Sequence, residues 1–224
     1  MRNTRCGFLL FLAAVFSGCQ RDNPKTTHHL SISELGDRIA HLPLAERYEL
    51  TKLTADPLPD LAPVGQRNDQ PSSSLAKSIA KDLHRLTLSE ADTLGQYLDK
   101  TYNGTGPIFA KVPALRQQKA LKKIREIQAR LTSDQNAWIQ DPVTTLDLDL
   151  PWLRQQLGTD VNEVVRVSFA REYYDLGTHH SDVSDFEMRY VAALPGLRRL
   201  DLQHSDVGSV GLKQLSVLRL LEDL

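Results

Sequence analysis

The feature that most constrains the fold of this chain is an internal repeat with a period of 24 residues near its C-terminal end. The tetrapeptide His180–Val183 recurs unchanged as His204–Val207. A unit this short buries its apolar edge only by stacking on a copy of itself, so the repeat predicts a solenoid segment. Six apolar positions continue in step at the same offset: Phe186 with Val210, Met188 with Leu212, Val191 with Leu215, Leu194 with Leu218, Leu197 with Leu221, and Leu200 with Leu224.

The order of residues within one unit indicates the kind of solenoid. Apolar residues at Leu194, Leu197, Leu200 and Leu202 are followed by a polar turn and the pattern Val207-x-x-x-Gly211-Leu212-x-x-Leu215. This order resembles a leucine-rich repeat, in particular the bacterial type with a Val-x-x-x-Gly-Leu-x-x-Leu helical half. The resemblance implies an α/β fold in which parallel strands at Leu200–Leu202 stack into a sheet and short helices cover the convex side. Ser205 departs from the family, which often has Asn or Cys there, so we expect a weaker side-chain ladder below the strand.

The strand that precedes the two matching units has two candidates. Val165–Phe169 alternates and is rich in β-branched residues, but it begins 35 residues before Leu200 and requires an insertion of about eleven residues within Arg171–His179. The strict offset instead places this strand at Leu176–Thr178. We favour Val165–Phe169 because its β propensity is higher.

Earlier residues extend the predicted repeat segment to 141–224, of which 180–224 carry the clear repeat. We expect a further strand at Leu146–Leu150, with Pro151–Leu157 as its helix. A solenoid usually ends in a polar capping unit, whereas this sequence stops at Leu224 within a unit. The uncapped end predicts either a truncated reading frame or an edge that pairs with another chain.

The N-terminal residues 1–18 have the composition of an export signal peptide. Arg2 and Arg5 precede an apolar run over residues 7–16, about half the roughly 20 residues that a membrane-spanning helix needs. The run ends in Phe16-Ser17-Gly18-Cys19, which resembles the lipobox of bacterial lipoproteins, although that family usually has Leu at the position of Phe16. The resemblance implies cleavage before Cys19 and acylation of this residue.

An acylated Cys19 has consequences for location and chemistry. Each buried methylene of an acyl chain contributes about 0.8 kcal/mol, so several chains anchor a protein durably to a membrane. Residues 19–30 are polar and contain Pro24, so we expect a tether. Gln20 is not the Asp that retains lipoproteins at the inner membrane in well-studied Gram-negative sorting, which favours the outer membrane. We therefore predict an exported protein, lipid-anchored in the bacterial cell envelope.

Residues 31–140 predict a helical region. Ser31 and Glu34 have the spacing of a capping box, and a second short helix is expected at 44–53. Prolines and serines make residues 56–74 an irregular stretch. The expected core positions recur at helical spacing: Leu35, Ile39 and Leu42; Leu75, Ile79, Leu83 and Leu86; Leu94, Leu98 and Tyr102 after a cap within Ser89–Asp92; and Leu115, Leu121, Ile124, Ile127 and Leu131 in a helix beginning near Pro113.

The remaining face of the helix from Pro113 to Leu131 is basic. It carries six basic side chains against Glu126 alone, a local net charge of +5: Arg116, Lys119, Lys122, Lys123, Arg125 and Arg130. Such a face can contact lipid head groups, an acidic polymer or a partner protein, although we favour a solvated helix face. The whole chain has 27 basic and 28 acidic side chains and therefore no global attraction for nucleic acid, from which the export signal also separates it.

The candidate binding residues are Arg199, Asp201 and Gln203, which the predicted strand exposes on the concave face of the solenoid. Leucine-rich repeats are mostly protein-binding surfaces, so we expect these side chains to contact a protein or an envelope polymer. His180 and His204 would occupy equivalent places on stacked units, about 5 Å apart, a geometry that suits a metal or a pH-sensitive patch. Copying of the unit also explains the pair and is the interpretation we favour, so we predict no metal site and no cofactor.

No catalytic signature occurs in the sequence. It lacks a Gly-x-Ser-x-Gly nucleophile elbow, a phosphate-binding loop, a dinucleotide fingerprint and a His-Glu-x-x-His helix. Lipidation of Cys19 would also exclude cysteine catalysis. Our first hypothesis is a non-enzymatic envelope lipoprotein that binds a protein or envelope polymer through its repeat surface. The alternatives are an enzyme or accessory subunit whose site lies in the helical region, and a truncated gene product without a separate function.

Overall fold

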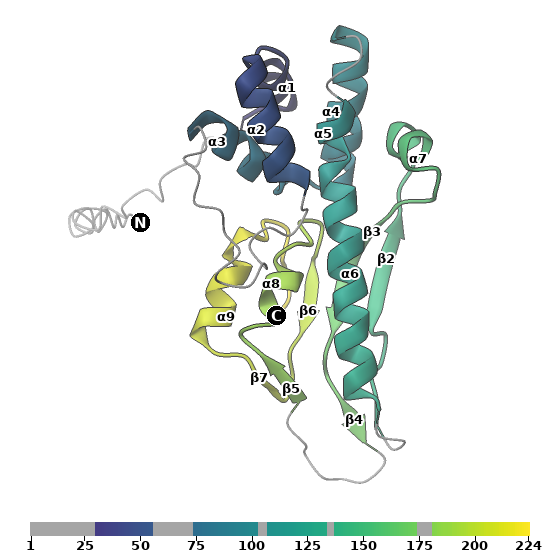
Figure 1. The fold of residues 1–224 in the computed structure, drawn as a ribbon. Coiled ribbons are helices and arrows are strands. Elements are labelled where there is room, and N and C mark those ends of the chain that lie inside the picture. The colour runs from purple at the N-terminus through teal and green to yellow at the C-terminus, as the bar shows by residue number, and fades with distance from the viewer. Residues whose placement is uncertain (1–29, 56–73, 103–106, 134–136, 174–180) are drawn as a thin grey trace, which may run out of the picture.

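The computed structural model describes residues 30–55, 74–102, 107–133, 137–173 and 181–224. A cluster of helices lies at one end, a small sheet lies at the other, and one long helix runs beside both (Figure 1). The signal peptide, Cys19, the Leu176–Thr178 alternative and His180 all lie outside the described residues. The described part is an α/β structure, as predicted from the sequence.

The helical region consists of five helices around one apolar core. Ser31 caps the first of them, accepting from the Glu34 amide at 3.2 Å while the Glu34 carboxylate accepts from the Ser31 amide at 2.8 Å, which confirms the predicted capping box. The predicted cap within Ser89–Asp92 is wrong, because Thr87 is the N-cap and pairs with Glu90. The helices are α1 (Ile32–Ala40), α2 (Leu44–Ala55), α3 (Ser74–Leu83), α4 (Leu88–Thr101) and α5 (Pro107–Ala110).

Helix α6 (Val112–Leu131) belongs to both halves of the molecule. Near its start Ala114 is buried in the core of the helical region. Further along, Ile124, Ile127 and Leu131 are buried in a second core, which α6 shares with the sheet and the repeat. Leu115 is 41% exposed, so its predicted core role is wrong, and the same holds for Leu75 of α3.

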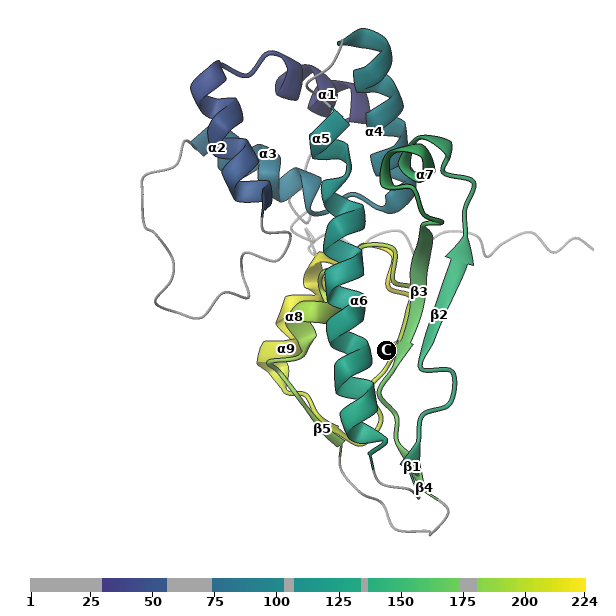
Figure 2. The ribbon, with the colours of Figure 1, turned by 45° about the vertical axis from the view of Figure 1, so that its right-hand side comes forward.

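The main sheet has three strands in the order β2 (Val143–Asp147), β3 (Asn162–Ser168) and β6 (Arg199–Asp201). Strand β3 is antiparallel to β2 and parallel to β6, and Figure 2 shows α6 lying alongside this sheet. A small antiparallel pair, β1 (Ala137–Trp138) and β4 (Glu172–Tyr173), lies at the far end. The sheet is therefore mixed, and its parallel part lies on the side of the predicted repeat.

The predicted strand at Leu146–Leu150 is wrong in its bounds and its role. The strand there is β2, which ends at Asp147 and runs antiparallel to its neighbour, so it is not a preceding unit of a parallel stack. The helix predicted at Pro151–Leu157 is confirmed as α7, but it packs on α4 and Trp152 lies in the core of the helical region. In a parallel crossover, the connecting helix covers a face of the sheet. Helix α7 instead packs on α4 of the helical region.

Strand β3 confirms the preferred assignment of a strand at Val165–Phe169, although it begins earlier and ends at Ser168. Val167 of β3 is paired with Leu200 of β6, a separation of 33 residues. The insertion relative to the 24-residue period is therefore nine residues rather than about eleven. The difference arises because β6 aligns with the middle of the predicted strand rather than with its first residue.

The two matching units lie side by side. Each contains a short strand of a second, parallel pair, β5 (Ser181–Ser184) and β7 (Ser205–Asp206), followed by the short helices α8 (Met188–Val191) and α9 (Ser209–Gln214), the latter continued by the 3-10 turn η2 (Leu215–Val217). The first unit is the better buried one. Its core residues Met188, Val191, Leu194 and Leu197 have no exposed surface, whereas Leu212 is 43% exposed. Phe186 and Val210 are both exposed and do not belong to the core.

Gly211, the glycine of the predicted motif, lies where the two units touch. A Cβ at this position would lie 3.0 Å from the Asp185 Cα and 2.8 Å from the Val207 Cγ1. Asp185 also accepts a hydrogen bond from the Gly208 amide at 2.6 Å through its carboxylate, and its carbonyl accepts one from the Gln214 side chain at 3.0 Å. The motif therefore contains glycine because the preceding unit packs against its backbone.

Candidate functional site

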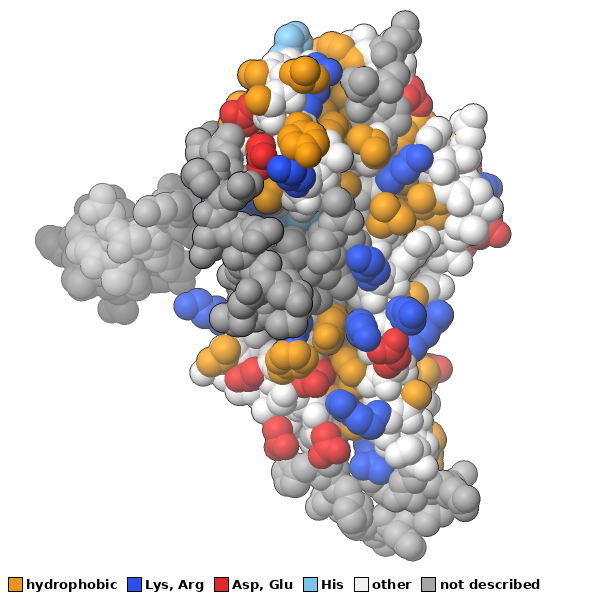
Figure 3. All heavy atoms as spheres, viewed as in Figure 1, with side chains coloured by type: hydrophobic (Ala, Val, Ile, Leu, Met, Phe, Trp, Pro, Cys, Tyr) orange, Lys and Arg blue, Asp and Glu red, His pale blue; other side chains and the backbone are white. Residues whose placement is uncertain are grey.

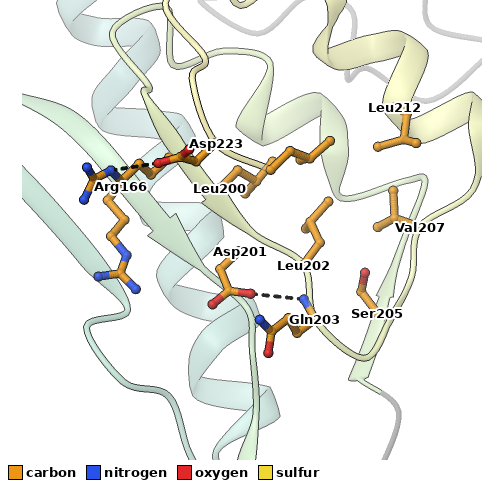
Figure 4. Close-up of a pocket in the computed structure, with 11 residues that line it drawn as sticks. Arg166, Leu200, Asp201, Leu202, Gln203, Ser205, Val207, Leu212 and Asp223 are labelled. Carbon is orange, nitrogen blue, oxygen red and sulfur yellow. Dashed lines mark hydrogen bonds and ion pairs between the residues drawn. The ribbon is translucent and has the colours of Figure 1, made fainter.

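The predicted binding residues Arg199, Asp201 and Gln203 line one groove, with a volume of about 590 Å³. Arg199 and Gln203 are exposed, whereas Asp201 is half-buried. Figure 4 shows side chains around this groove that come from β3, from β6 and the turn after it, from α9 and from the last residues of the chain. The structure thus brings the three predicted residues together and adds neighbours that sequence reasoning missed.

Strand pairing places the polar residues of the groove in rows across the sheet. Arg199 is paired with Arg166 of β3 on one side and with Asp223 in an isolated parallel bridge on the other. Two residues further along the strands, Asp201 is paired with the buried Ser168. Because paired residues of neighbouring strands point to the same face, these side chains share the face opposite the buried Leu200.

Hydrogen bonds and ion pairs hold the groove side chains loosely. The Arg199 Nε lies 3.1 Å from the Asp223 Oδ2, and both side chains are about two-thirds exposed. The Asp201 Oδ1 accepts from the Gln203 amide at 3.1 Å, and the Asp201 Oδ2 accepts from the Ser168 hydroxyl at 3.5 Å. Exposed ion pairs contribute about 0–1 kcal/mol, so a partner can replace these contacts at small cost.

The floor of the groove is apolar. Leu200, Leu202, Val207 and Leu212 lie on the other side of β6 from the polar side chains and point toward the space between β6 and α9 (Figure 4). Leu224 lines the same groove, which therefore extends over both sides of the strand. Leu212 is 43% exposed and Leu224 is 67% exposed. An apolar floor with a rim of opposite charges combines apolar contact with orienting polar groups, as protein-binding surfaces do.

Arg166 and Asp223 are the functional candidates that sequence reasoning missed. Arg166 lies in a strand identified for its β propensity, and only its register with Arg199 places it at the groove. Asp223 lies 24 residues after Arg199, so the repeat offset itself was the signal that could have found it.

The histidine pair is only partly placed. His204 is exposed and has a φ of 60°, in the left-handed region of the turn after β6, while His180 lies outside the described residues. Among the residues that the structure describes, no group of three or more His, Cys, Asp and Glu side chains has the geometry to hold a metal ion.

A polar cluster in the helical region surrounds Asp37. The Asp37 Oδ1 accepts hydrogen bonds from the hydroxyls of Tyr97 at 2.7 Å and Tyr102 at 2.8 Å. These bonds lower the pKa of Asp37, and the bond to Asp37 is the main cause that raises the pKa of Tyr102 to about 12. The two hydrogen bonds join α1, which carries Asp37, to the C-terminal end of α4.

Within the described ranges, no helix is both long enough and apolar enough to cross a membrane. No family model, curated protein or solved structure matches the chain.

Proposed function

We propose that this chain is a non-enzymatic lipoprotein of the bacterial cell envelope, built on leucine-rich repeats, that binds a protein or an envelope polymer in the groove beside β6. Arg199, Asp201 and Gln203 provide polar contacts at its rim, and the leucines of the floor provide the apolar contacts. Cys19 carries the lipid anchor that holds the protein at the membrane.

The observation that carries the proposal is strand pairing at the period of the sequence repeat. Ser181 of β5 is paired with Ser205 of β7, and Arg199 of β6 is paired with Asp223, each at a separation of 24 residues and each parallel. Two strand pairs at the same offset support one stacked unit following another, as in a solenoid. The approach of Asp185 to the backbone of Gly211 supports the same arrangement on the helical side.

The groove supports a binding role through its composition. Two arginines and two aspartates at the rim, Arg166, Arg199, Asp201 and Asp223, balance in formal charge, so the groove is suited to a partner that also carries both signs. The exposed leucines of the floor offer apolar contact area, which contributes on the order of 25 cal/mol per Å² when a partner covers it.

The binding proposal is tested with two variants of the full-length protein of matched composition. The groove variant carries Arg199→Ala, Asp201→Ala and Gln203→Ala. The control variant removes the same residue types from the exposed surface at and after α7, through Arg154→Ala, Gln155→Ala and Asp160→Ala.

Each protein is incubated with envelope extracts, and the captured material is compared by mass spectrometry. A partner that binds the unchanged protein and the control variant but not the groove variant supports the proposal. If all three proteins capture the same partners, the groove is not the binding site.

The anchor is tested independently on the protein isolated from its native envelope. Mass spectrometry of the N-terminal peptide is expected to show cleavage before Cys19 and acylation of this residue. An unmodified Cys19 thiol rejects the lipoprotein assignment and leaves the groove proposal unaffected.

A further inference from the structure

A second pocket lies where the helical region meets the repeat, and its polar side chains are basic. It has a volume of about 390 Å³, within the range of roughly 300–1,000 Å³ typical of small-molecule sites. Among the described residues that line it, none is acidic. Its basic side chains are Lys77, Lys81, His84, Arg85 and Arg116.

The convergence of these side chains follows from the placement of α3. Lys77 and Lys81 are one helical turn apart, and Arg85 follows one turn later beyond the end of the helix. The opposite face of α3 is fixed, because Ile79 and Leu83 are fully buried in the core of the helical region. Lys77 and Lys81 are exposed and line the pocket together with Ala80 of the same helix.

The opposite walls come from elements distant in sequence. Arg116 of α6 adds a fourth permanent cation, while Leu53, Ala192 and Val217 supply apolar surface. Figure 3 shows that Lys and Arg side chains also gather over α6. An anion that approaches this side meets several cations and then apolar contacts.

Two carboxylates lie close in sequence to the basic residues of this pocket. Asp82 and Glu90 line a different pocket, on the side of α1, which Arg85 lines as well. Glu90 is engaged by the Arg219 guanidinium, which lies 3.1 Å from its Oε2 and donates a further hydrogen bond to the Arg85 carbonyl at 3.0 Å. Arg85 therefore borders both pockets, and Glu90 is engaged by Arg219.

We propose that this basic pocket binds a phosphate-bearing ligand, with the phosphate held by Lys77, Lys81, Arg85 and Arg116 and an adjoining apolar part held by the leucine, alanine and valine walls. Several cations around one concave site match the charge and the multiple acceptor oxygens of a phosphate group. The phosphate can belong to a lipid head group or to a soluble phosphate compound, and the two sources are separable by experiment.

The test measures binding of two probes to the full-length protein by isothermal titration calorimetry. Inorganic pyrophosphate represents a soluble phosphate, and a short-chain phosphatidylglycerol, used as a monomer, represents a lipid head group. Binding of the first alone assigns a soluble ligand, binding of the second alone assigns a lipid, and binding of both assigns recognition of the phosphate itself.

The Lys77→Gln/Lys81→Gln variant decides whether the pocket is responsible. Both side chains are exposed, so the fold is expected to persist. Each removed charge is expected to weaken binding about fivefold, which corresponds to about 1 kcal/mol for unit charges 4 Å apart in water. The matched control, Lys122→Gln/Arg125→Gln, removes the same charge from the exposed surface of α6 outside the pocket and is expected to change affinity less than twofold. Absence of binding by both probes, or equal weakening by the two variants, overturns the proposal.

Discussion

Replacement of Gln128 by leucine tests how α6 holds the sheet that carries the groove. Gln128 is 6% exposed, and its Nε2 donates to the carbonyl of Ser168 at 2.8 Å and to the carbonyl of Pro142 at 2.7 Å. Ser168 ends β3 and Pro142 precedes β2, so one side chain of α6 holds both strands at the same end. Leucine has a similar volume but donates no hydrogen bond.

The expected loss follows from what happens to each carbonyl. The Ser168 carbonyl is left unsatisfied in a buried environment, which costs about 1–3 kcal/mol. The Pro142 carbonyl keeps the hydrogen bond that it accepts from the Ser168 amide at 3.0 Å, so the loss there is that of one hydrogen bond, about 0.5–1.5 kcal/mol. Since leucine leaves no cavity, we expect Gln128→Leu to lower the free energy of unfolding by about 1.5–4.5 kcal/mol in total.

The assay is equilibrium unfolding in urea, followed by circular dichroism, with Gln118→Leu as the control. Gln118 is exposed on the same helix, so its replacement is expected to change the free energy of unfolding by less than about 0.5 kcal/mol. A loss below about 0.5 kcal/mol for Gln128→Leu as well would refute the inference that this side chain holds the sheet.

Three further predictions concern stability. Gly211→Ala is expected to cost about 1–3 kcal/mol, because the new methyl group meets the Asp185 backbone; unchanged unfolding in urea would show that the two units do not pack this closely. Asp92→Ala is also expected to cost about 1–3 kcal/mol, since the buried carboxylate accepts from the Leu153 amide in the first turn of α7 at 2.8 Å; Asp92→Asn keeps an acceptor and is expected to lose less in the same measurement. Burial is the main cause that raises the pKa of Glu163 in the folded protein, so the folded state binds this proton more tightly than the unfolded state. The contribution of Glu163 to stability is therefore present below the pKa that this carboxyl has in the unfolded chain. It is lost as the pH rises through the higher pKa that the carboxyl has in the folded protein. In unfolding measured across the acidic range, Glu163→Gln is expected to remove this loss, and a pH-independent difference between the two proteins would contradict the assignment.

Local signals predicted a large part of the fold. The Ser31–Glu34 capping box and the helix at Pro151–Leu157 depend on interactions within a few residues, and both are present. The strand at Val165–Phe169 combines alternation with β-branched residues, which favour a pleated, half-buried surface. The groove residues Arg199, Asp201 and Gln203 followed from alternation along one strand, and they do share one groove.

Predictions that depended on tertiary context were less successful. The sequence did not predict that β2 runs antiparallel to its neighbour, because no residue within Val143–Asp147 indicates the direction of the paired strand. Gln117 and Gln128 look like solvent-facing positions of a basic helix, yet both are buried and bind backbone groups of the sheet. Leu115 looks like a core residue by spacing, yet it is exposed because α6 changes the neighbour it packs against along its length.

The sharing of α6 between two cores has a consequence for how the protein unfolds. Ala114 lies in one core and Ile124 in the other, within a single uninterrupted helix. Because helix formation is itself cooperative, melting of either half exposes one end of α6 and removes support from the other. The two halves are therefore expected to behave as one cooperative unit in hydrogen exchange, with amides on both sides of α6 opening at similar free energies. A ligand in the pocket between them would then protect amides throughout the described chain, including strands that it never touches.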